Sequence, residues 1–197
     1  MSTTTVVEKK QLRQQLRSLR QQLSPEQQQQ AAVNLVRIVS QESVWLHSQH
    51  IAVYVSNDGE INPQPLVELG WQLGKNIYLP VIDDNRPGHL LFLPWQPDTR
   101  LSNNRFGIPE PKRFASEPLN PSQLDLILLP LVGFDAKGRR LGMGGGFYDR
   151  TLKDIASLSS VVMVGLAHSI QEVSFIPTDH WDLSLSAVFT DQAAMTF

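Results

Sequence analysis

Residues 126–150, LILLPLVGFDAKGRRLGMGGGFYDR, decide how this chain of 197 residues is interpreted. The stretch begins with the continuous apolar run Leu126–Leu131, which is typical of a central parallel strand covered on both faces. Six of the twelve glycines follow, between Gly133 and Gly146, and a helix is predicted over about residues 147–157. A buried strand, a glycine-rich loop and a helix in this order predict an α/β fold with the loop at the carboxyl end of the strand.

The alternation of strands and helices extends outward from this stretch. Leu90–Trp95 is expected at an antiparallel edge of the sheet, because Pro94 interrupts it. Residues 96–123 are rich in proline and show little periodicity, which predicts a long surface excursion. No internal repeat or linker divides the chain, so we expect residues 1–197 to form a single domain. The pattern predicts further strands at 51–55, 77–82, 161–166 and 183–190, and further helices at 12–23, 25–39 and 63–73.

The composition excludes several classes of protein. A hydrophobic fraction of 41% argues against disorder, and the absence of cysteine excludes a disulfide scaffold, a thiol nucleophile and cysteine-ligated metal sites. The longest apolar stretches are far shorter than the roughly 20 residues that span a bilayer, and the polar N-terminus shows no secretory signal. We therefore expect a cytoplasmic protein without a membrane partner.

The charge is distributed unevenly along the chain. The net charge is −2, but residues 1–23 hold five basic residues and one acidic residue, which gives +4 there and −6 in the remainder. Leucines and arginines recur at helical spacing, which predicts an amphipathic helix with an apolar and a basic stripe. The helix is expected to end at Ser24, which can cap a second helix with Pro25 in its first position. The residues of the two stripes are Leu12, Leu16, Leu19 and Leu23, and Arg13, Arg17 and Arg20.

The glycine-rich loop leaves two interpretations open. A loop at the end of a parallel strand, followed by a helix, can bind phosphate through backbone N–H groups, but it can also be a mobile structural turn. Neither common phosphate motif is present. Gly133-x4-Gly138 is followed by Arg139-Arg140, and Phe147 stands where a dinucleotide fold has its third glycine.

Residues 129–150 resemble the signature of the 5-formyltetrahydrofolate cyclo-ligase family. The resemblance extends in family order over the Lys9-x-x-x-Arg13 helix, the segment Val55–Glu60, the segment Phe106–Pro111 and the region of Asp182. It implies a single three-layer α/β/α domain around a mostly parallel sheet, with an N-terminal amphipathic basic helix. It also implies ATP-dependent closure of 5-formyltetrahydrofolate to 5,10-methenyltetrahydrofolate, with release of ADP and phosphate.

The chemistry explains why such a reaction uses ATP. An N-formyl group is an amide, so its carbon is a weak electrophile and its oxygen a poor leaving group. Transfer of the γ-phosphoryl group to the formyl oxygen gives a phosphorylated imidate, which N10 of the folate can attack. The site must hold the two substrates in line and neutralise charge, which requires cations, N–H donors and Mg²⁺.

The resemblance assigns roles to particular residues. Arg140, Tyr148 and Asp149 are expected to be catalytic, and Asp149 and Asp182 to hold magnesium. Substrate contacts are expected from Val55, Glu60, Phe106 and Tyr148. The residues expected to bind ATP are Lys9, Arg13, Arg140, Leu141, Gly142, Met143, Gly144, Gly145, Gly146, Phe147 and Tyr148.

Each of these residues also has an ordinary structural interpretation, such as a solvated charge, a helix N-terminal carboxylate or a core side chain. Arg17 and Arg20 keep that interpretation, as a solvated basic face, and the five histidines are expected to be surface or core residues. The sequence departs from the family at Phe147, where many members have tyrosine, and at Gly145, where some carry a basic side chain.

Two other functions compete with the cyclo-ligase. A sugar-phosphate isomerase or CoA-transferase relative uses a similar sheet but does not need the 140–150 loop together with a basic helix. An RNA-binding module using the N-terminal helix is disfavoured by the acidic remainder of the chain. We expect a monomer that binds 5-formyltetrahydrofolate and ATP and no nucleic acid.

Overall fold

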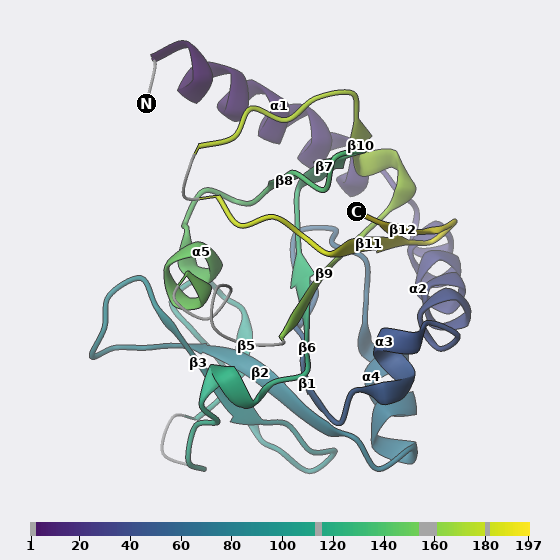
Figure 1. Cartoon of the computed structure of the whole chain (residues 1–197), viewed down its shortest axis with the longest axis vertical. Helices are drawn as coiled ribbons and strands as arrows, with labels where there is room; N and C mark the ends of the chain where they lie inside the picture. Colours follow the sequence, from purple (N-terminus) through teal and green to yellow (C-terminus); the bar gives the residue numbers. More distant parts are fainter. Residues whose placement is uncertain (1–2, 113–115, 154–160, 180–181) are drawn as a thin grey trace.

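A seven-stranded sheet forms the centre of the computed structural model, which describes residues 3–112, 116–153, 161–179 and 182–197 (Figure 1). The strand order is β12-β11-β9-β6-β1-β2-β3. The five inner strands are parallel, and the edge strands β12 and β3 are antiparallel to their neighbours. The strands are β1 (His50–Ala52), β2 (Asn76–Ile82), β3 (Leu90–Pro94), β6 (Leu126–Pro130), β9 (Val162–Ala167), β11 (Ala187–Thr190) and β12 (Ala194–Thr196).

Helices cover both faces of this sheet. Figure 1 shows α2, α3 and α4 on one side of it and α5 on the other. Along β6, Leu126 and Leu128 pack in the core cluster of α2, α3 and α4, whereas Ile127 and Leu129 pack in the cluster that includes Leu152 of α5. The continuous apolar run is thus explained by burial on both faces, and the predicted mixed α/β fold is confirmed. The α-helices are α1 (Thr3–Gln21), α2 (Pro25–Val39), α3 (Ser43–His47), α4 (Gln64–Gln72) and α5 (Phe147–Leu152).

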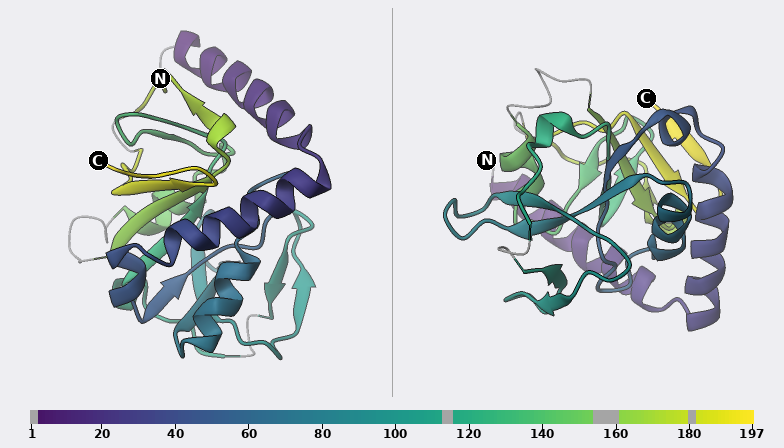
Figure 2. Two further views of the ribbon diagram at one scale, coloured as in Figure 1. Left: turned by 90° about the vertical axis from the view of Figure 1, so that its right-hand side faces the viewer. Right: turned by 90° about the horizontal axis from the view of Figure 1, so that it is seen from below.

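Helix α1 stands apart from the helices on the two faces of the sheet and leans over the end of the sheet (Figure 2). Its Leu16 is buried against Val132, Leu141 and Ile176, close to a small sheet with the order β10-β7-β8. This small sheet consists of β7 (Gly133–Asp135), β8 (Arg140–Leu141) and β10 (Glu172–Val173), and the 3-10 helix η2 (Ser169–Gln171) precedes β10.

The chain turns sharply between α1 and α2, as predicted at Ser24. The Ser24 hydroxyl accepts a hydrogen bond from the Gln27 amide at 3.3 Å, and the Gln27 side chain accepts one from the Ser24 amide at 2.8 Å. Pro25 is the first residue of α2. This reciprocal cap satisfies two N–H groups at the start of α2 and fixes the point at which α1 departs from the layered core.

Several predicted boundaries differ from the structure. Residues 96–123 contain a hairpin of β4 (Leu101–Asn103) and β5 (Pro109–Pro111), followed by the 3-10 helix η1 (Pro121–Gln123). The strand predicted at 51–55 ends as β1 at Ala52, and the last strand is followed by β12, which the sequence did not predict. The helix predicted over 147–157 begins as expected, and α5 ends at Leu152; residues 154–157 of the predicted range lie outside the described residues.

The antiparallel edge strand predicted at Leu90–Trp95 is confirmed. It is β3, which pairs with β2 in antiparallel fashion at the edge of the sheet. The predicted strands at 77–82 and 161–166 are confirmed as β2 and β9, and the predicted helix at 63–73 as α4. Within the described part of the chain, none of the helices has the length and apolar character needed to cross a membrane.

Candidate functional site

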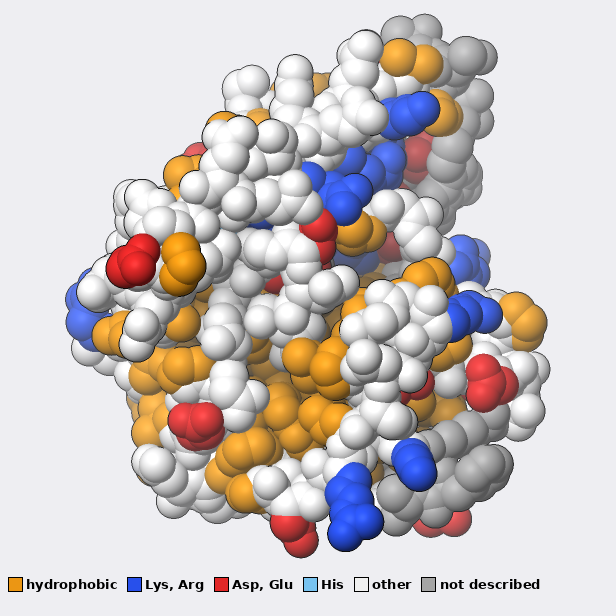
Figure 3. Space-filling view, turned by 180° about the vertical axis from the view of Figure 1, so that it is seen from behind, with side chains coloured by type: hydrophobic (Ala, Val, Ile, Leu, Met, Phe, Trp, Pro, Cys, Tyr) orange, Lys and Arg blue, Asp and Glu red, His pale blue; other side chains and the backbone are white. Residues whose placement is uncertain are grey.

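A cavity of about 950 Å³ lies beneath α1, at the carboxyl ends of the central parallel strands. Open α/β sheets bind ligands in this position. Figure 3 shows the molecule hollowed beneath its overhanging upper part, with Lys and Arg side chains gathered above hydrophobic ones. Every residue that the sequence assigned to ATP, folate or magnesium lines this cavity, although the assignments come from five separate segments of the chain.

The glycine-rich loop, residues 142–146, connects β8 to α5. Gly144 and Gly146 have positive φ angles of 98° and 65°, a conformation that residues with a Cβ rarely adopt. Arginines hold two of the loop carbonyls. Arg13 Nε donates to the Gly142 carbonyl at 2.8 Å, and Arg150 donates to the carbonyls of Gly145 and Gly88. The loop is therefore fixed from α1 on one side and from α5 on the other.

Lys9 of α1 bridges two carboxylates at the mouth of the cavity. Its ammonium lies 2.9 Å from Asp179 Oδ2 and 2.8 Å from Asp182 Oδ2. Burial opposes the charged form of Lys9, but the hydrogen bonds to the two carboxylates outweigh it and raise its pKa. The predicted nucleotide cation and a predicted metal ligand therefore form an ion pair with each other.

A second ion pair lies at the start of α5. Arg140 Nη2 donates to Asp149 Oδ1 at 2.5 Å, and the same oxygen accepts the Leu183 amide at 3.3 Å. Arg140 is buried, with an exposed fraction of 8%, and its Nε has no hydrogen-bond partner among the described residues. A buried guanidinium with a spare donor on the cavity wall is suited to an oxyanion ligand.

Glu60 supplies a buried carboxylate at another part of the cavity wall. Its Oε2 accepts the Asn57 amide at 3.1 Å. Burial raises the pKa of Glu60 to about 7, although the charge of Arg20 acts in the opposite direction. Burial also raises the pKa of the Tyr148 hydroxyl, with a further contribution from Glu60, so Tyr148 remains a neutral hydrogen-bond donor at neutral pH.

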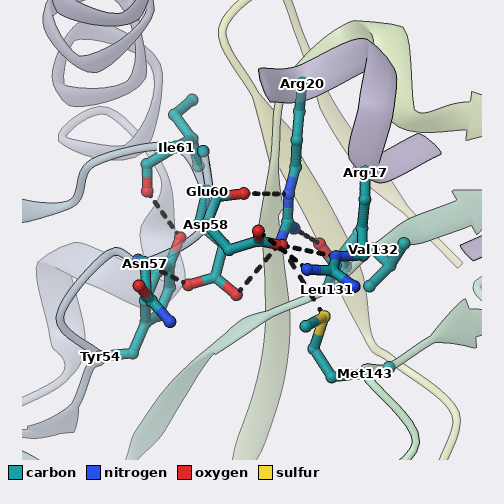
Figure 4. Close-up of polar contacts among 12 residues, drawn as sticks. Arg17, Arg20, Tyr54, Asn57, Asp58, Glu60, Ile61, Leu131, Val132 and Met143 are labelled. Carbon is teal, nitrogen blue, oxygen red and sulfur yellow. Dashed lines mark hydrogen bonds and ion pairs between the residues drawn. The ribbon is translucent and has the colours of Figure 1, made fainter. Parts of the chain in front are cut away.

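The prediction of a solvated side chain was wrong for Arg20, whereas Arg17 is partly exposed. Arg20 is fully buried, whereas Leu19, assigned to the apolar stripe, is 46% exposed. Both arginines point from α1 to Asp58 in the turn after β1 (Figure 4). Arg17 first and Arg20 second lower the pKa of Asp58 to about 2 against the effect of its burial. A guanidinium can replace an apolar side chain inside the fold when carboxylate and carbonyl oxygens satisfy its donors.

The opening of the cavity has an aromatic edge. Phe106, in the β4–β5 hairpin, is 55% exposed and lies edge-on to Phe147, with ring centroids 6.0 Å apart. Phe147 has no hydroxyl, so this contact joins two apolar rings. Val55, predicted on the same wall, follows β1 and also lines the cavity.

Sequence reasoning did not single out several polar side chains of the cavity wall, among them Tyr54, Asn104, Glu110 and Asp179. Tyr54 donates from its hydroxyl to the Ile61 carbonyl at 2.8 Å, and Asn104 Nδ2 donates to Glu110 Oε2 at 2.9 Å. Asp179 shares Lys9 with Asp182. Glu110 carried a signal, because it belongs to the 106–111 segment that resembles the family. The lining residues Asn57 and Asp58 carried the same kind of signal, because they belong to the Val55–Glu60 segment.

The donor set of the cavity fits Mg²⁺ only together with a ligand. The described residues contain no cluster of three His, Asp or Glu side chains suited to a metal ion. Mg²⁺ commonly uses one or two protein carboxylates and completes its coordination with phosphates and water. Asp149 and Asp182 both line the cavity, so two carboxylates can meet a phosphate-bound ion there.

The raised pKa of Glu60 predicts a pH-dependent cost to stability. A carboxyl group with a higher pKa in the folded state binds more protons when folded, so stability falls as pH rises from about 4.5 to about 7. Glu60→Gln removes this loss. We expect the variant to unfold like the wild type at pH 4 and to be more stable by up to about 3 kcal/mol at pH 8, measured by urea unfolding.

Glu68→Gln, on the exposed surface of α4, is the matched control. It removes an acidic side chain that does not line the cavity. Parallel stability curves for Glu60→Gln and the wild type from pH 4 to pH 8 would contradict the buried environment of Glu60.

Comparison with known proteins assigns the chain to a family. A family model described as the 5-formyltetrahydrofolate cyclo-ligase family matches residues 5–191. The chain is 42% identical to the 5-formyltetrahydrofolate cyclo-ligase of Haemophilus influenzae, over 90% of this chain and 94% of the relative. It is also 42% identical to that of Escherichia coli, over 89% of this chain and 96% of the relative.

A solved structure supports the same assignment. The NMR structure of Aquifex aeolicus 5,10-methenyltetrahydrofolate synthetase is similar to this chain, with a TM-score of 0.81 and 28% identity. The similarity covers 95% of this chain and 92% of the Aquifex aeolicus chain. The match over nearly the whole sequence, the identity to the two bacterial ligases and the shared fold agree. The chain therefore belongs to the 5-formyltetrahydrofolate cyclo-ligase family and is a ligase of folate one-carbon metabolism.

Proposed function

We propose that the chain closes 5-formyltetrahydrofolate to 5,10-methenyltetrahydrofolate and converts ATP to ADP and phosphate in the process, with the formyl oxygen as the phosphoryl acceptor. The observation that carries the proposal is that one cavity is lined by both sets of predicted residues, those for the triphosphate and those for the folate. The two sets come from distant parts of the sequence, so their meeting in one cavity does not follow from the motif alone.

The nucleotide end of the cavity is assigned to Lys9, Arg13, Arg140 and the loop 142–146. These groups supply cations and backbone N–H groups, which suit a triphosphate. Arg13 contacts the loop, so a bound phosphate would meet the loop and the α1 cations together. Leu141 and Met143 complete this wall.

The folate end is assigned to Val55, Glu60 and Phe106. A buried carboxylate is the acceptor that the ring N–H groups of a pterin require, and an exposed aromatic ring suits the face of a flat ligand. Glu60 is mostly buried, and Phe106 stands at the opening. Tyr148 is assigned to the boundary between the two ends, because its hydroxyl is influenced by the charges of both Glu60 and Arg140.

The reaction follows from these assignments. The formyl oxygen attacks the γ-phosphorus and ADP leaves. The N10 lone pair then attacks the imidate carbon, the carbon–oxygen bond breaks, and phosphate departs with the former formyl oxygen while N10 loses its proton. Arg140 would stabilise charge on the transferring phosphoryl group, and the neutral Tyr148 hydroxyl would donate a hydrogen bond beside it.

We assign magnesium to Asp149 and Asp182. Bound with the triphosphate, the ion would neutralise negative charge on the β- and γ-phosphates. In the structure Asp149 is paired with Arg140, and Asp182 with Lys9. Nucleotide binding would thus exchange protein–protein ion pairs for contacts with phosphate and the ion, and Lys9 and Arg140 would then be available to the phosphate oxygens.

We also propose that residues 1–197 act as a single domain and as a monomer, without nucleic acid. The basic side chains Lys9, Arg13, Arg17 and Arg20 all make contacts within the molecule, at the cavity or at Asp58. The basic stripe on which the RNA-binding alternative depended is therefore used internally. A cytoplasmic location stays a prediction from the sequence.

The proposed reaction is tested by following the absorbance of the methenyl product from 5-formyltetrahydrofolate. Product should form only when ATP and Mg²⁺ are both present, with one ADP released for each product. Formyl oxygen labelled with ¹⁸O should appear in the released phosphate. Product formation without ADP release, or unlabelled phosphate, would contradict phosphorylation of the formyl oxygen.

The two ends of the cavity should separate in kinetic measurements. Arg13→Ala should raise the KM for ATP about tenfold or more and change the KM for folate little, because the lost cation faces the glycine-rich loop. Glu60→Gln should raise the KM for folate and change the KM for ATP little. Lys10→Ala, an exposed neighbour on α1, is the control and should change neither constant. Equal changes in both constants for either variant would contradict the assignment of ends.

Asp149→Asn distinguishes a metal ligand from a helix N-terminal carboxylate. As a metal ligand, Asp149 predicts a fall in kcat of about 100-fold or more, partly recovered at high Mg²⁺, with the fold intact by circular dichroism. As a favourable charge at the start of α5, it predicts a stability loss of about 0.3 to 1 kcal/mol and nearly normal turnover. Asp98→Asn, on an exposed loop away from the cavity, is the control.

A further inference from the structure

Arg20 joins three segments of the chain from a fully buried position. Its Nε donates to the Asp58 carbonyl at 2.8 Å, its Nη2 to Asp58 Oδ2 at 2.8 Å and its Nη1 to the Leu131 carbonyl at 3.1 Å. Each nitrogen of the guanidinium thus has an oxygen partner. These contacts connect α1 to the turn after β1 and to the end of β6.

The turn that Arg20 holds has an unusual backbone. Asp58 has a φ angle of 53°, and it is the only residue other than glycine with positive φ in the described part of the chain. The following Gly59 has a φ of 74°, and a Cβ there would lie 3.1 Å from the Arg20 carbonyl. Such a conformation costs free energy and persists when the surroundings determine it. Helix α1 provides these surroundings.

Glu60 follows this turn directly, and Arg20 also lies close to its carboxylate. Arg20 Nη2 lies 3.7 Å from Glu60 Oε1, within ion-pair distance (Figure 4). Arg17 does not share this contact. It binds Asp58 through its Nε and Nη2 at 2.7 and 3.0 Å, and its side chain is 41% exposed. The two arginines therefore share Asp58 but differ in their relation to Glu60.

Other titratable groups also face Glu60 or its arginine. Asp58, from the same turn, opposes ionisation of Glu60. Tyr54 after β1 and Tyr148 of α5 both have pKa values raised by burial, so they are neutral near pH 7. His168, before η2, has its pKa lowered by burial. Arg20 is the group among these that favours the charged form of Glu60.

We propose that Arg20 is a positioning residue for folate: Arg20 fixes the turn at Asp58 and keeps the Glu60 carboxylate ionised and in place on the cavity wall. The proposal rests on the assignment of Glu60 to the folate in the proposed function. Arg20 does not line the cavity, and the proposal assigns it a defined effect on substrate affinity. The effect should depend on pH, because protonated Glu60 loses its charge as an acceptor.

The experiment is a titration of the full chain with 5-formyltetrahydrofolate in the absence of ATP, from pH 5.5 to pH 9. Wild-type affinity should fall as pH decreases through about 7, the pKa of Glu60. Arg20→Met should move this midpoint up by about one unit or more, which lowers affinity near neutral pH about tenfold. Arg20→Lys should keep the midpoint within about 0.5 unit, because it retains the charge, but bind about 3- to 10-fold more weakly, because one ammonium cannot hold all three oxygens.

Two further variants control the interpretation. Arg17→Met removes a guanidinium from the same helix and from the same carboxylate, and should leave the midpoint unchanged. In the Glu60→Gln background the pH dependence should vanish, and Arg20→Lys should then weaken binding less than it does in the wild type. This double-mutant cycle measures the action of Arg20 through Glu60.

The conservative variant keeps the proposal testable, because Arg20→Lys retains the buried charge even if Arg20→Met does not fold. An Arg20→Lys chain with wild-type affinity, or an Arg17→Met chain with the same midpoint shift as Arg20→Met, overturns the positioning role. A wild type that binds folate with no dependence on Glu60 also overturns it but leaves the proposed reaction standing. A wild type that binds no 5-formyltetrahydrofolate contradicts the proposed function as well.

Discussion

The guanidinium of Arg20 is the interaction on which the cavity depends. It is fully buried, and its partners lie on the turn at Asp58 and at the end of β6. Burial of a charge costs several kcal/mol unless the geometry supplies partners, and here a carboxylate and two carbonyls supply them. The reciprocal cap at Ser24 sets the direction of α1, and Arg20 attaches the helix over the sheet. The overhang that results brings the N-terminal cations within reach of the glycine-rich loop.

Ion pairs hold the charged side chains of the cavity wall in place, and they also neutralise those charges. Lys9 is held by Asp179 and Asp182, and Arg140 by Asp149. In the proposed reaction a triphosphate and Mg²⁺ replace these partners, so part of the binding free energy is used to separate the pairs. Charges held in place before the ligand arrives need little reorganisation during phosphoryl transfer. Glu60 carries a different cost, that of burying a carboxylate. Burial raises its pKa to about 7, and Arg20 offsets only part of this effect.

The sequence predicted the sheet core and the membership of the cavity well, for physical reasons. The continuous apolar run at 126–131 is typical of a strand buried on two faces, and Ser24 followed by Pro25 is a strong local signal for a helix start. Local signals fail where tertiary contacts decide. Leu19 and Arg20 exchanged their expected environments because the partner of Arg20 lies 38 residues away at Asp58. Tyr54 and Asp179 were missed for the same reason, and β12 and the β4–β5 hairpin because short edge strands have little periodicity.

The central claim is that the cavity beneath α1 holds the triphosphate and the folate at opposite ends, with the pterin at Glu60. The most direct measurement is a crystal structure of the protein with 5-formyltetrahydrofolate and a non-hydrolysable ATP analogue. We expect pterin N–H groups within about 3.2 Å of the Glu60 carboxylate, and the γ-phosphate between the 142–146 loop and the formyl oxygen. A pterin ring bound away from Glu60, or a triphosphate outside the glycine-rich loop, would contradict the claim.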